Sequence, residues 1–281
     1  RGTLRSAQDH ELAHEVLAPS ALHRRFPAFS PLDDMVGVLE HRAGILLPEA
    51  IVQAHLELAA HHGATLRVDT RIDGWDQGAG CVAIRIGGET VRARQLVVAA
   101  GVSIGELLPE LQPLLTVERR TIHWFEPVRF PEYFTPERMP VSLWELEDGT
   151  LFYTKPDLGD GVKIGIHHGG EAAHRRRSGA SAHDAADEED AEVYDLLRRF
   201  VPFAKGHQRE RATCRYTMAP DAHFIIDRHP AADNVLILSP CSGHGFKFAS
   251  VIGELAADLL TTGGCAFELS PFSIRRFSAW A

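Results

Sequence analysis

The apolar run Leu96-Val-Val-Ala-Ala-Gly101 does more than any other feature to limit the folds open to this chain. A short continuous apolar run predicts a buried strand, and a helix is predicted directly after it, at Ile104–Leu111. Strands buried on both faces are typical of parallel sheets, which bind ligands beyond the carboxyl ends of their strands. The run therefore predicts an α/β sheet with a ligand close to Gly101.

The stretches on either side of this run predict two kinds of sheet. A strand at Met35–Leu39, a helix at Glu49–His62 and a strand at Ala64–Val68 form a strand–helix–strand unit. Residues 116–167 alternate as antiparallel strands, and 169–192, with HRRR and DEED runs, are predicted to form a solvated loop. Because α/β elements return after residue 192, the order predicts a mixed α/β (α+β) fold of two interleaved domains.

Composition excludes several kinds of partner. The net charge of -9 argues against a nucleic-acid-binding surface, and no apolar run approaches the ~20 residues that cross a membrane. The four cysteines form no CxxC pair, which fits a reducing compartment and hence the cytoplasm. The chain begins without a methionine, and we expect it to be a piece of a longer protein.

A glycine-rich segment near the end of the chain carries reactive side chains. In Cys241-Ser-Gly-His-Gly-Phe-Lys-Phe248, Gly243 and Gly245 allow close approach of the backbone to a flat ligand. Lys247 is one of only four lysines, beside 25 arginines. Upstream, Cys214 is a thiol near Tyr216, although a lone cysteine is more often a small buried hydrophobic residue.

The strand Val162-Lys-Ile-Gly-Ile-His167 places Lys163, Gly165 and His167 on one face. A glycine between a lysine and a histidine leaves room for a flat molecule or for water. The alternative, a half-exposed strand with one polar face, stays open on this pattern alone.

One motif predicts a different chemistry. His10-Glu-Leu-Ala-His14 matches HExxH, and we expect apolar positions at helical spacing to form a helix within residues 3–17, ended by Pro19. Two histidines four apart on a helix could bind zinc, with Glu11 as base. Pro19 follows closely and no third ligand lies at metzincin spacing, so a solvated helix surface is favoured over a zinc hydrolase. The pairs His61-His62 and His167-His168 are expected to diverge.

Three ordered motifs resemble one known family. They are Thr213-Cys-Arg-Tyr-Thr217, His223-Phe-Ile-Ile-Asp-Arg-His-Pro230 and Ser239-Pro-Cys-Ser-Gly-His-Gly-Phe-Lys-Phe248. Together they resemble the monomeric sarcosine oxidase / N-methyl-tryptophan oxidase family, a branch of the FAD-dependent D-amino-acid-oxidase-like superfamily. The similarity extends from about Leu4 to Arg276.

The resemblance implies roles for individual residues. Cys214 would carry FAD through a thioether, and Lys163 would lie near flavin N5 and activate O₂. Tyr153, His167, Tyr216 and His244 match the family's substrate cavity, and Lys247 the cation for the substrate carboxylate. Gly101, Gly243, Gly245, Phe246 and Lys247 would contact the cofactor, and Lys163, His167, Tyr216 and His244 would be the catalytic residues. Trp124 and Trp144 are candidates for the cavity or, equally, for the core.

The resemblance also implies an activity and a domain plan. The enzyme, a monomer, would oxidise an N-methyl or secondary amino acid to an imine that hydrolyses, and O₂ would become H₂O₂. Residues 1–33 and 114–218 would form an antiparallel-sheet substrate domain, and residues 34–113 and 219–281 a Rossmann-like FAD domain. Three alternatives stay open: an FAD-dependent amino-acid dehydrogenase, the zinc hydrolase and a non-catalytic binding protein.

One family feature has no match. The strand–GxGxxG–helix that holds the FAD pyrophosphate is not found in this sequence, since Gly159-Asp-Gly161 lacks the third glycine and the following helix. We expect that part to be in an upstream segment, the chain being the C-terminal three-quarters. We therefore expect this chain alone to bind FAD poorly.

Overall fold

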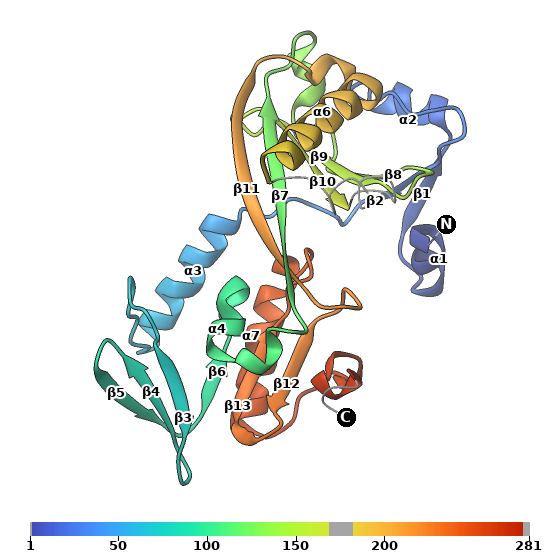
Figure 1. The fold of residues 1–281 in the computed structure, drawn as a ribbon. Helices are drawn as coiled ribbons and strands as arrows, with labels where there is room; N and C mark the ends of the chain where they lie inside the picture. Colours follow the sequence, from blue (N-terminus) through green and yellow to red (C-terminus); the bar gives the residue numbers. More distant parts are fainter. Residues whose placement is uncertain (1, 169–181, 278–281) are drawn as a thin grey trace. The chain divides into compact units, whose positions relative to one another are not determined.

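The computed structural model describes residues 2–168 and 182–277, with side chains of α6 from Glu189 onward. The chain forms two compact units, each built from two segments. The first unit comprises residues 1–45 and 120–214, and the second comprises residues 46–119 and 215–281. Two of the crossings between units lie inside strands, β7 (Thr116–Phe125) and β11 (Gln208–Met218) (Figure 1).

A five-stranded sheet is the centre of the first unit, in the order β11-β7-β10-β9-β8. Besides β7 and β11, its strands are β8 (Ser142–Glu145), β9 (Leu151–Lys155) and β10 (Val162–His168). The pairs β7–β10, β10–β9 and β9–β8 are all antiparallel, which confirms the alternation predicted for residues 116–167. The alternation is clearest in β10, where apolar Val162, Ile164 and Ile166 occupy every second position.

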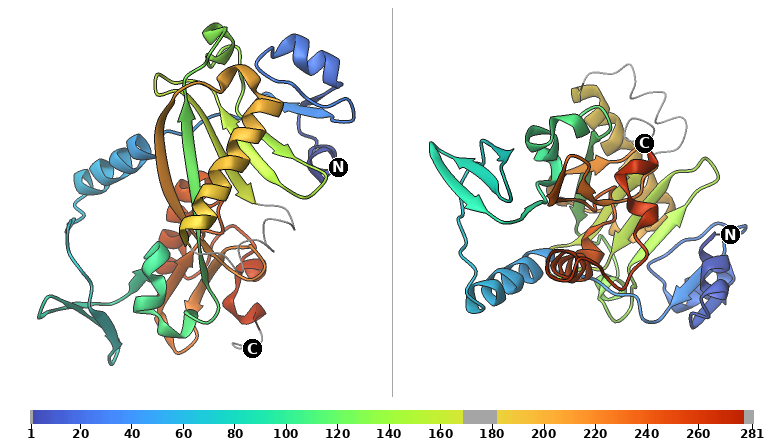
Figure 2. Two further views of the ribbon diagram at one scale, coloured as in Figure 1. Left: turned by 45° about the horizontal axis from the view of Figure 1, so that its top comes forward. Right: turned by 90° about the horizontal axis from the view of Figure 1, so that it is seen from below.

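The helix α6 (Ala182–Phe200) lies along one face of this sheet (Figures 1 and 2). Its apolar side chains share a buried core with Phe125 of β7, Phe152 of β9 and alternate residues of β10. The members from α6 are Val193, Leu196, Leu197 and Phe200, and those from β10 are Val162, Ile164 and Ile166. Trp144 belongs to this core too, stacked 5.6 Å from Phe152 between ring centroids. The solvated loop expected at 169–192 is thus wrong for 182–192, where charged residues form helix; residues 169–181 lie outside the described part.

The amino-terminal segment corrects a second expectation. Residues 3–17 are not one helix: α1 (Gly2–Asp9) ends before Glu11, whose φ is 52°, and β1 (His14–Leu17) follows. β1 pairs antiparallel with β2 (Gly37–Glu40). Pro19 ends no element but begins the helix α2 (Pro19–Arg25), a position where its missing N–H costs nothing.

A three-stranded sheet, β12-β13-β6, is the centre of the second unit. Its strands are β12 (Ile225–His229), β13 (Ala232–Ser239) and β6 (Leu96–Val98). β6 pairs parallel with β13, Val97 opposite Leu236, which confirms the buried parallel strand predicted from the apolar run. Residues of α7 (Ala249–Thr261) pack on this sheet through Ile252 and Leu255.

Short elements complete the second unit. β3 (Gly74–Gln77), β4 (Val82–Ile86) and β5 (Glu89–Ala93) form an antiparallel meander. Gly87 and Gly88 have φ of 53° and 88°, so the two-residue turn between β4 and β5 requires glycine. Besides α7, the helices of this unit are α3 (Pro48–His61) and α4 (Ile104–Leu107). The described 3₁₀ turns of both units are η1 (Gly101–Ser103), η2 (Pro109–Leu111), η3 (Pro131–Phe134), η4 (Pro202–Ala204), η5 (Phe246–Phe248), η6 (Ser270–Phe272) and η7 (Ile274–Arg276).

The predicted strand–helix–strand unit is wrong. The helix α3 matches its predicted range, but residues 64–68 form no strand, and β2 pairs with β1 rather than with a parallel partner. A segment with an alternating pattern also needs a neighbouring strand to complete its backbone hydrogen bonds. The parallel pair that the described residues do form is β6–β13.

Candidate active site

The first group of predicted site residues lies on the face of the five-stranded sheet away from α6, here called the Lys163 face. Because Val162, Ile164 and Ile166 point into the α6 core, Lys163 and Gly165 point the other way. The register places Trp124 and Ile122 of β7 on one side of them, and Lys155 and Tyr153 of β9 on the other. The structure thus brings Tyr153 and Lys163 together, as their proposed roles in one cavity require.

Gly165 leaves room for the side chain of Tyr153 on the neighbouring strand. A Cβ at this position would lie 2.6 Å from the phenol oxygen of Tyr153 and 2.8 Å from the adjoining ring carbon. The room that the glycine leaves is therefore filled by the cross-strand tyrosine. The space that the sequence predicts above Gly165 for a flat molecule or for water is thus taken by the Tyr153 ring.

The ammonium of Lys163 lies over an aromatic ring. Its Nζ is 4.6 Å from the centroid of the Trp124 ring, a cation–π distance. Trp124 is half-buried, whereas Trp144 is 8% exposed and packed in the core. The two tryptophans that the sequence left undecided are therefore divided: Trp144 is a core residue, and Trp124 contacts the predicted catalytic lysine.

His167 occupies a β-bulge, because the β9–β10 register shifts between Ile166 and His168. The rings of His167 and His168 come within 4.3 Å between centroids, so the expectation that their side chains diverge is wrong. Buried Arg120 donates its Nε–H to the His167 carbonyl oxygen at 3.1 Å, which ties the bulge to β7.

Cys214 and Tyr216 both belong to β11, but to different units. Cys214 is a half-buried free thiol at the end of the first unit's share of the strand. Tyr216 is half-buried in the second unit. The residue after it, Thr217, accepts a hydrogen bond from Ser242 N–H at 2.9 Å, which joins the end of β11 to the glycine-rich segment.

The glycine-rich segment is a tight turn between β13 and η5. Ser242 is buried with φ of 44°, and its Oγ donates to the His223 carbonyl at 2.9 Å. A Cβ on Gly245 would lie 2.7 Å from the carbonyl carbon of Pro240, so the turn itself requires this glycine. Gly243 has φ of 78°, which also favours glycine.

His244 is held by two contacts. Its Nδ1 lies 2.8 Å from the Ser242 carbonyl oxygen, and since a carbonyl only accepts, Nδ1 carries the proton and donates. Its ring stacks 4.9 Å from that of Phe224, at 28°. In this tautomer Nε2 is the nitrogen left as an acceptor. Nearby Cys241 is less reactive, because burial raises the pKa of its thiol.

Lys247 and Phe246 are exposed at η5, and the ammonium of Lys247 is 5.6 Å from the Phe248 ring centroid. No carboxylate pairs with Lys247 in the described part of the chain. Gly101 follows β6, with φ of 54° and no atom within 4 Å of where a Cβ would stand. Because β6 and β13 are parallel, Gly101 and the glycine-rich turn lie at the same end of the sheet.

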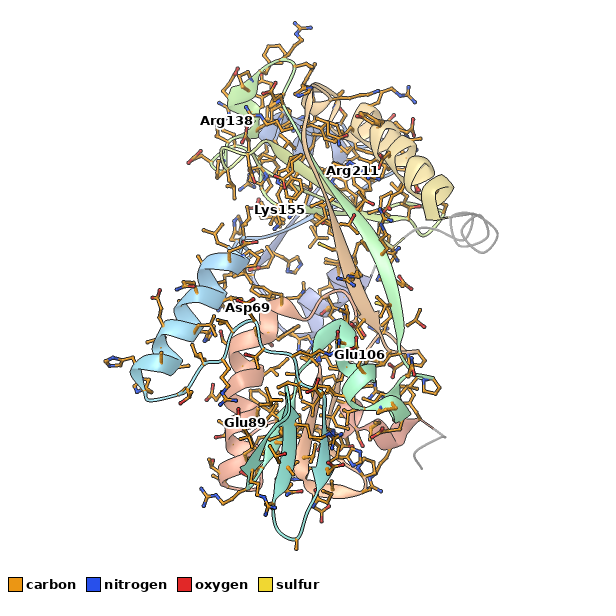
Figure 3. The ribbon with its side chains drawn as sticks, turned by 60° about the vertical axis from the view of Figure 1, so that its left-hand side comes forward. Asp69, Glu89, Glu106, Arg138, Lys155 and Arg211 are labelled. Carbon is orange, nitrogen blue, oxygen red and sulfur yellow. The ribbon has the colours of Figure 1, made fainter. Side chains whose placement is uncertain are left out.

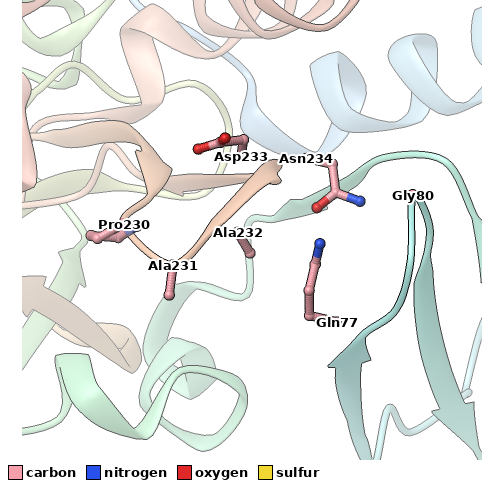
Figure 4. A pocket seen from close by; sticks show the side chains of 7 residues that line it. All are labelled: Gln77, Gly80, Pro230, Ala231, Ala232, Asp233 and Asn234. Carbon is pink, nitrogen blue, oxygen red and sulfur yellow. The ribbon is translucent and has the colours of Figure 1, made fainter.

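Gly101 leaves open space at the carboxyl end of β6. The sheet edge at Gly101 is open to close approach of a ligand, which fits the prediction of a cofactor contact there. A small pocket of about 380 Å³ elsewhere in the second unit does not include the predicted residues (Figure 4). It is lined by Gln77, Gly80, Pro230, Ala231, Ala232, Asp233 and Asn234. It offers no cation for a phosphate.

The zinc alternative, already disfavoured by the sequence, has no support in the geometry. His10 follows α1, Glu11 has a left-handed backbone and His14 is in β1, so the two histidines do not share a helix face. His14 Nδ1 donates to the Leu12 carbonyl at 2.7 Å. Among the described residues no group of three or more potential ligands could hold a metal, and none of their helices is long and apolar enough to cross a membrane.

Comparison with known proteins identifies the family and the fold. Residues 1–259 match the family model described as FAD dependent oxidoreductase. The chain is 36% identical to a monomeric sarcosine oxidase of Streptomyces avermitilis, over 99% of this chain and 73% of the relative. It is 33% identical to an N-methyl-L-tryptophan oxidase of Citrobacter koseri, over 97% of this chain and 72% of the relative.

Two solved structures show the same fold. NikD, an amino acid oxidase of nikkomycin biosynthesis, has a TM-score of 0.75 at 22% identity and covers 97% of this chain, which spans 71% of NikD. The L-proline dehydrogenase of P. horikoshii has a TM-score of 0.75 at 14% identity, over 98% of this chain and 71% of that structure. The chain belongs to the FAD-dependent oxidoreductase family. Membership of this family supports an FAD-dependent oxidoreductase rather than a zinc hydrolase or a non-catalytic binding protein.

Proposed function

We propose that this protein oxidises an N-methyl or other secondary amino acid to an imine, which hydrolyses, while O₂ is reduced to H₂O₂. The single observation that carries the proposal is the lysine of the Lys163 face, held over Trp124 beside Tyr153. The relatives named as sarcosine and N-methyltryptophan oxidases support the substrate class. FAD, when bound, accepts the two electrons removed from the substrate.

Lys163 supplies charge to the oxygen step. Trp124 fixes the position of the ammonium, which then attracts the negative charge that develops on O₂ as it is reduced. A fixed charge at ~4 Å is worth roughly 4 kcal/mol at an effective dielectric of about 20. That energy corresponds to about a thousandfold in rate. A lysine in this role favours an oxidase over the dehydrogenase alternative.

The remaining residues bind and orient the substrate. Exposed Lys247 would hold the substrate carboxylate, since an ammonium without an acidic partner in the described part of the chain is available for one. Nε2 of His244 would accept a hydrogen bond from the secondary amine, because Nδ1 is committed to Ser242. Tyr153, Tyr216 and His167 would line the cavity around the N-methyl group.

Cys214, Gly101, Gly243, Gly245 and Phe246 would hold the cofactor, with a thioether at Cys214. The free, half-buried state of the Cys214 thiol supports this assignment. Residues 1–33 and 114–218 would serve as the substrate domain, and residues 34–113 and 219–281 as the FAD domain. The free state of all four cysteines is consistent with the cytoplasm, and we propose a monomer.

Rapid-mixing kinetics on the flavin-loaded protein test the proposal. Lys163→Met should slow reoxidation by O₂ about a thousandfold and leave the rate of flavin reduction by sarcosine within a few-fold. Lys205→Met is the matched control, because the Lys205 ammonium lies over Tyr194 at 5.4 Å in the same unit. Substrate-dependent dye reduction without peroxide would support the dehydrogenase instead, and no reaction with any secondary amino acid would refute both.

A further inference from the structure

The Lys163 face holds a second lysine that the proposed reaction does not use. Lys155 on β9 is directly opposite Lys163 on β10 in the antiparallel register. Residues opposed in this way share a face, with Cβ atoms roughly 4.5–5.5 Å apart. Two of the chain's four lysines are therefore neighbours, in a protein whose net charge is -9. Lys155 is labelled in Figure 3.

This arrangement has an energetic cost. Like charges directly opposite each other destabilise a sheet, and both lysines are half-buried, where repulsion is screened less than in water. Lys163 relieves part of the repulsion on the β7 side, because its ammonium lies over the Trp124 ring. Lys155 has no such aromatic partner, and no carboxylate pairs with it within the described ranges 2–168 and 182–277.

The strand ends explain why Lys155 lacks an acidic partner among these residues. In the β8–β9 pairing, Glu145 lies opposite Leu151 and Ser142 lies opposite Thr154. The pairing therefore stops one residue before Lys155, which has no β8 residue opposite it. After Lys155, Asp157 turns away: its Oδ1 accepts from the N–H groups of Gly159 and Gly161 at 2.7 and 2.9 Å. The nearest acid in the sequence is thus used by its own loop.

We propose that Lys155 determines substrate specificity by binding a second anionic group, a carboxylate on the substrate's side chain. This deepens the proposed function and rests on it. A bound carboxylate would offset the repulsion between Lys155 and Lys163, and its charge-assisted hydrogen bond would favour acidic substrates by about 10- to 100-fold. The substrate class is then an N-methylated acidic amino acid, such as N-methylaspartate, rather than sarcosine itself.

The test compares two substrates on the flavin-loaded holoenzyme. Wild type should have a higher kcat/KM for N-methyl-L-aspartate than for sarcosine. Lys155→Met should lower the ratio of the two values about 10- to 100-fold, mainly through KM, and Lys155→Arg should restore most of it. Lys205→Met, which alters another lysine of the same unit, should leave the ratio unchanged.

Binding without turnover separates this inference from the proposed function. Calorimetry with succinate and acetate as probes gives the preference for a second carboxylate even if no amino acid is oxidised. An equal succinate-to-acetate preference in wild type and Lys155→Met would overturn the inference. It would also be overturned if Lys155→Met slowed reoxidation by O₂ equally after every substrate, since Lys155 would then serve the oxygen step.

Discussion

Tyr153 occupies the space that the missing side chain of Gly165 leaves on the neighbouring strand, with its phenol oxygen 2.6 Å from where a Cβ would stand. The contact joins a residue proposed to line the substrate cavity to the strand that carries Lys163. It makes Gly165 a requirement of packing between β9 and β10, and hence of the position of Tyr153.

Gly165→Ala should therefore destabilise the protein by about 1–3 kcal/mol, the usual cost of overpacking. Urea unfolding of the purified chain measures this change. Tyr153→Leu should rescue the substitution in the double variant, because the clash is with the ring. The control is Gly253→Ala in the helix α7, where a Cβ meets nothing within 4 Å; it should stabilise by about 0.5–1 kcal/mol. Equal effects of the two alanines would contradict the packing argument.

In the flavin-loaded holoenzyme, Cys214→Ala should release the yellow colour of the flavin into the supernatant after acid precipitation, while wild type keeps it on the polypeptide. The reason is that the proposed thioether is the only covalent link between cofactor and protein. Cys241→Ala is the matched control, because burial raises the pKa of that thiol and disfavours its reaction. Colour released equally from wild type and Cys214→Ala would rule out the thioether.

Asp221 accepts two hydrogen bonds from Arg276, at 2.6 and 3.0 Å, and this lowers the pKa of its carboxyl from 3.8 to about 2. A depressed carboxyl pKa adds stability above pH 4 that is lost as pH falls toward 2. Asp221→Asn should cost about 1 kcal/mol at pH 7, after allowance for solvent screening of this partly exposed pair. The difference from wild type, followed by chemical denaturation, should shrink below pH 4. A difference independent of pH would show that the charge is not responsible.

His123 is fully buried on β7, and neither ring nitrogen completes a hydrogen bond among the described residues. Burial lowers the pKa of its imidazole, although Asp190, 3.5 Å from Nε2, opposes the shift. The unfolded chain takes up a proton below about pH 6.5 that the folded chain does not, so this residue destabilises the fold at acid pH. His123→Leu should therefore gain stability relative to wild type on going from pH 7.5 to pH 5.5. If His123→Leu gained no stability relative to wild type over this pH range, the assignment would be contradicted.

The 281-residue chain alone should bind FAD weakly, because the sequence carries no strand–GxGxxG–helix for the pyrophosphate. Fluorescence titration with FAD measures this affinity directly. Tight stoichiometric binding would show that the residues present, including Gly101 and the glycine-rich turn, are sufficient.

β10 could be predicted because Val162, Ile164 and Ile166 form an apolar face and Lys163 lies on the opposite face. The prediction of a strand was wrong for residues 64–68, which alternate like a strand, because no described strand pairs with them. Residues 3–17 were too short a stretch to separate helix from strand, and the left-handed Glu11 divides them. In α6, acidic residues that suggested a loop lie on a helix whose later turns pack through Val193 and Leu197.

The candidate site shows the same limit. Period-two alternation is enough to place Lys163 and Gly165 on one face of β10. It does not give the register between β9 and β10, which depends on the turn after Lys155 and on the bulge at His167. The opposition of Lys155 and Lys163, and the contact of Trp124 with Lys163, therefore emerge only from the structure.

The interleaving of the two units has an evolutionary consequence. Residues 120–214 return the chain to the first unit after residues 46–119 have built part of the second, and two of the three crossings fall inside β7 and β11. Neither unit is encoded as one uninterrupted stretch of the gene. Recombination therefore cannot transplant either unit as a single uninterrupted segment.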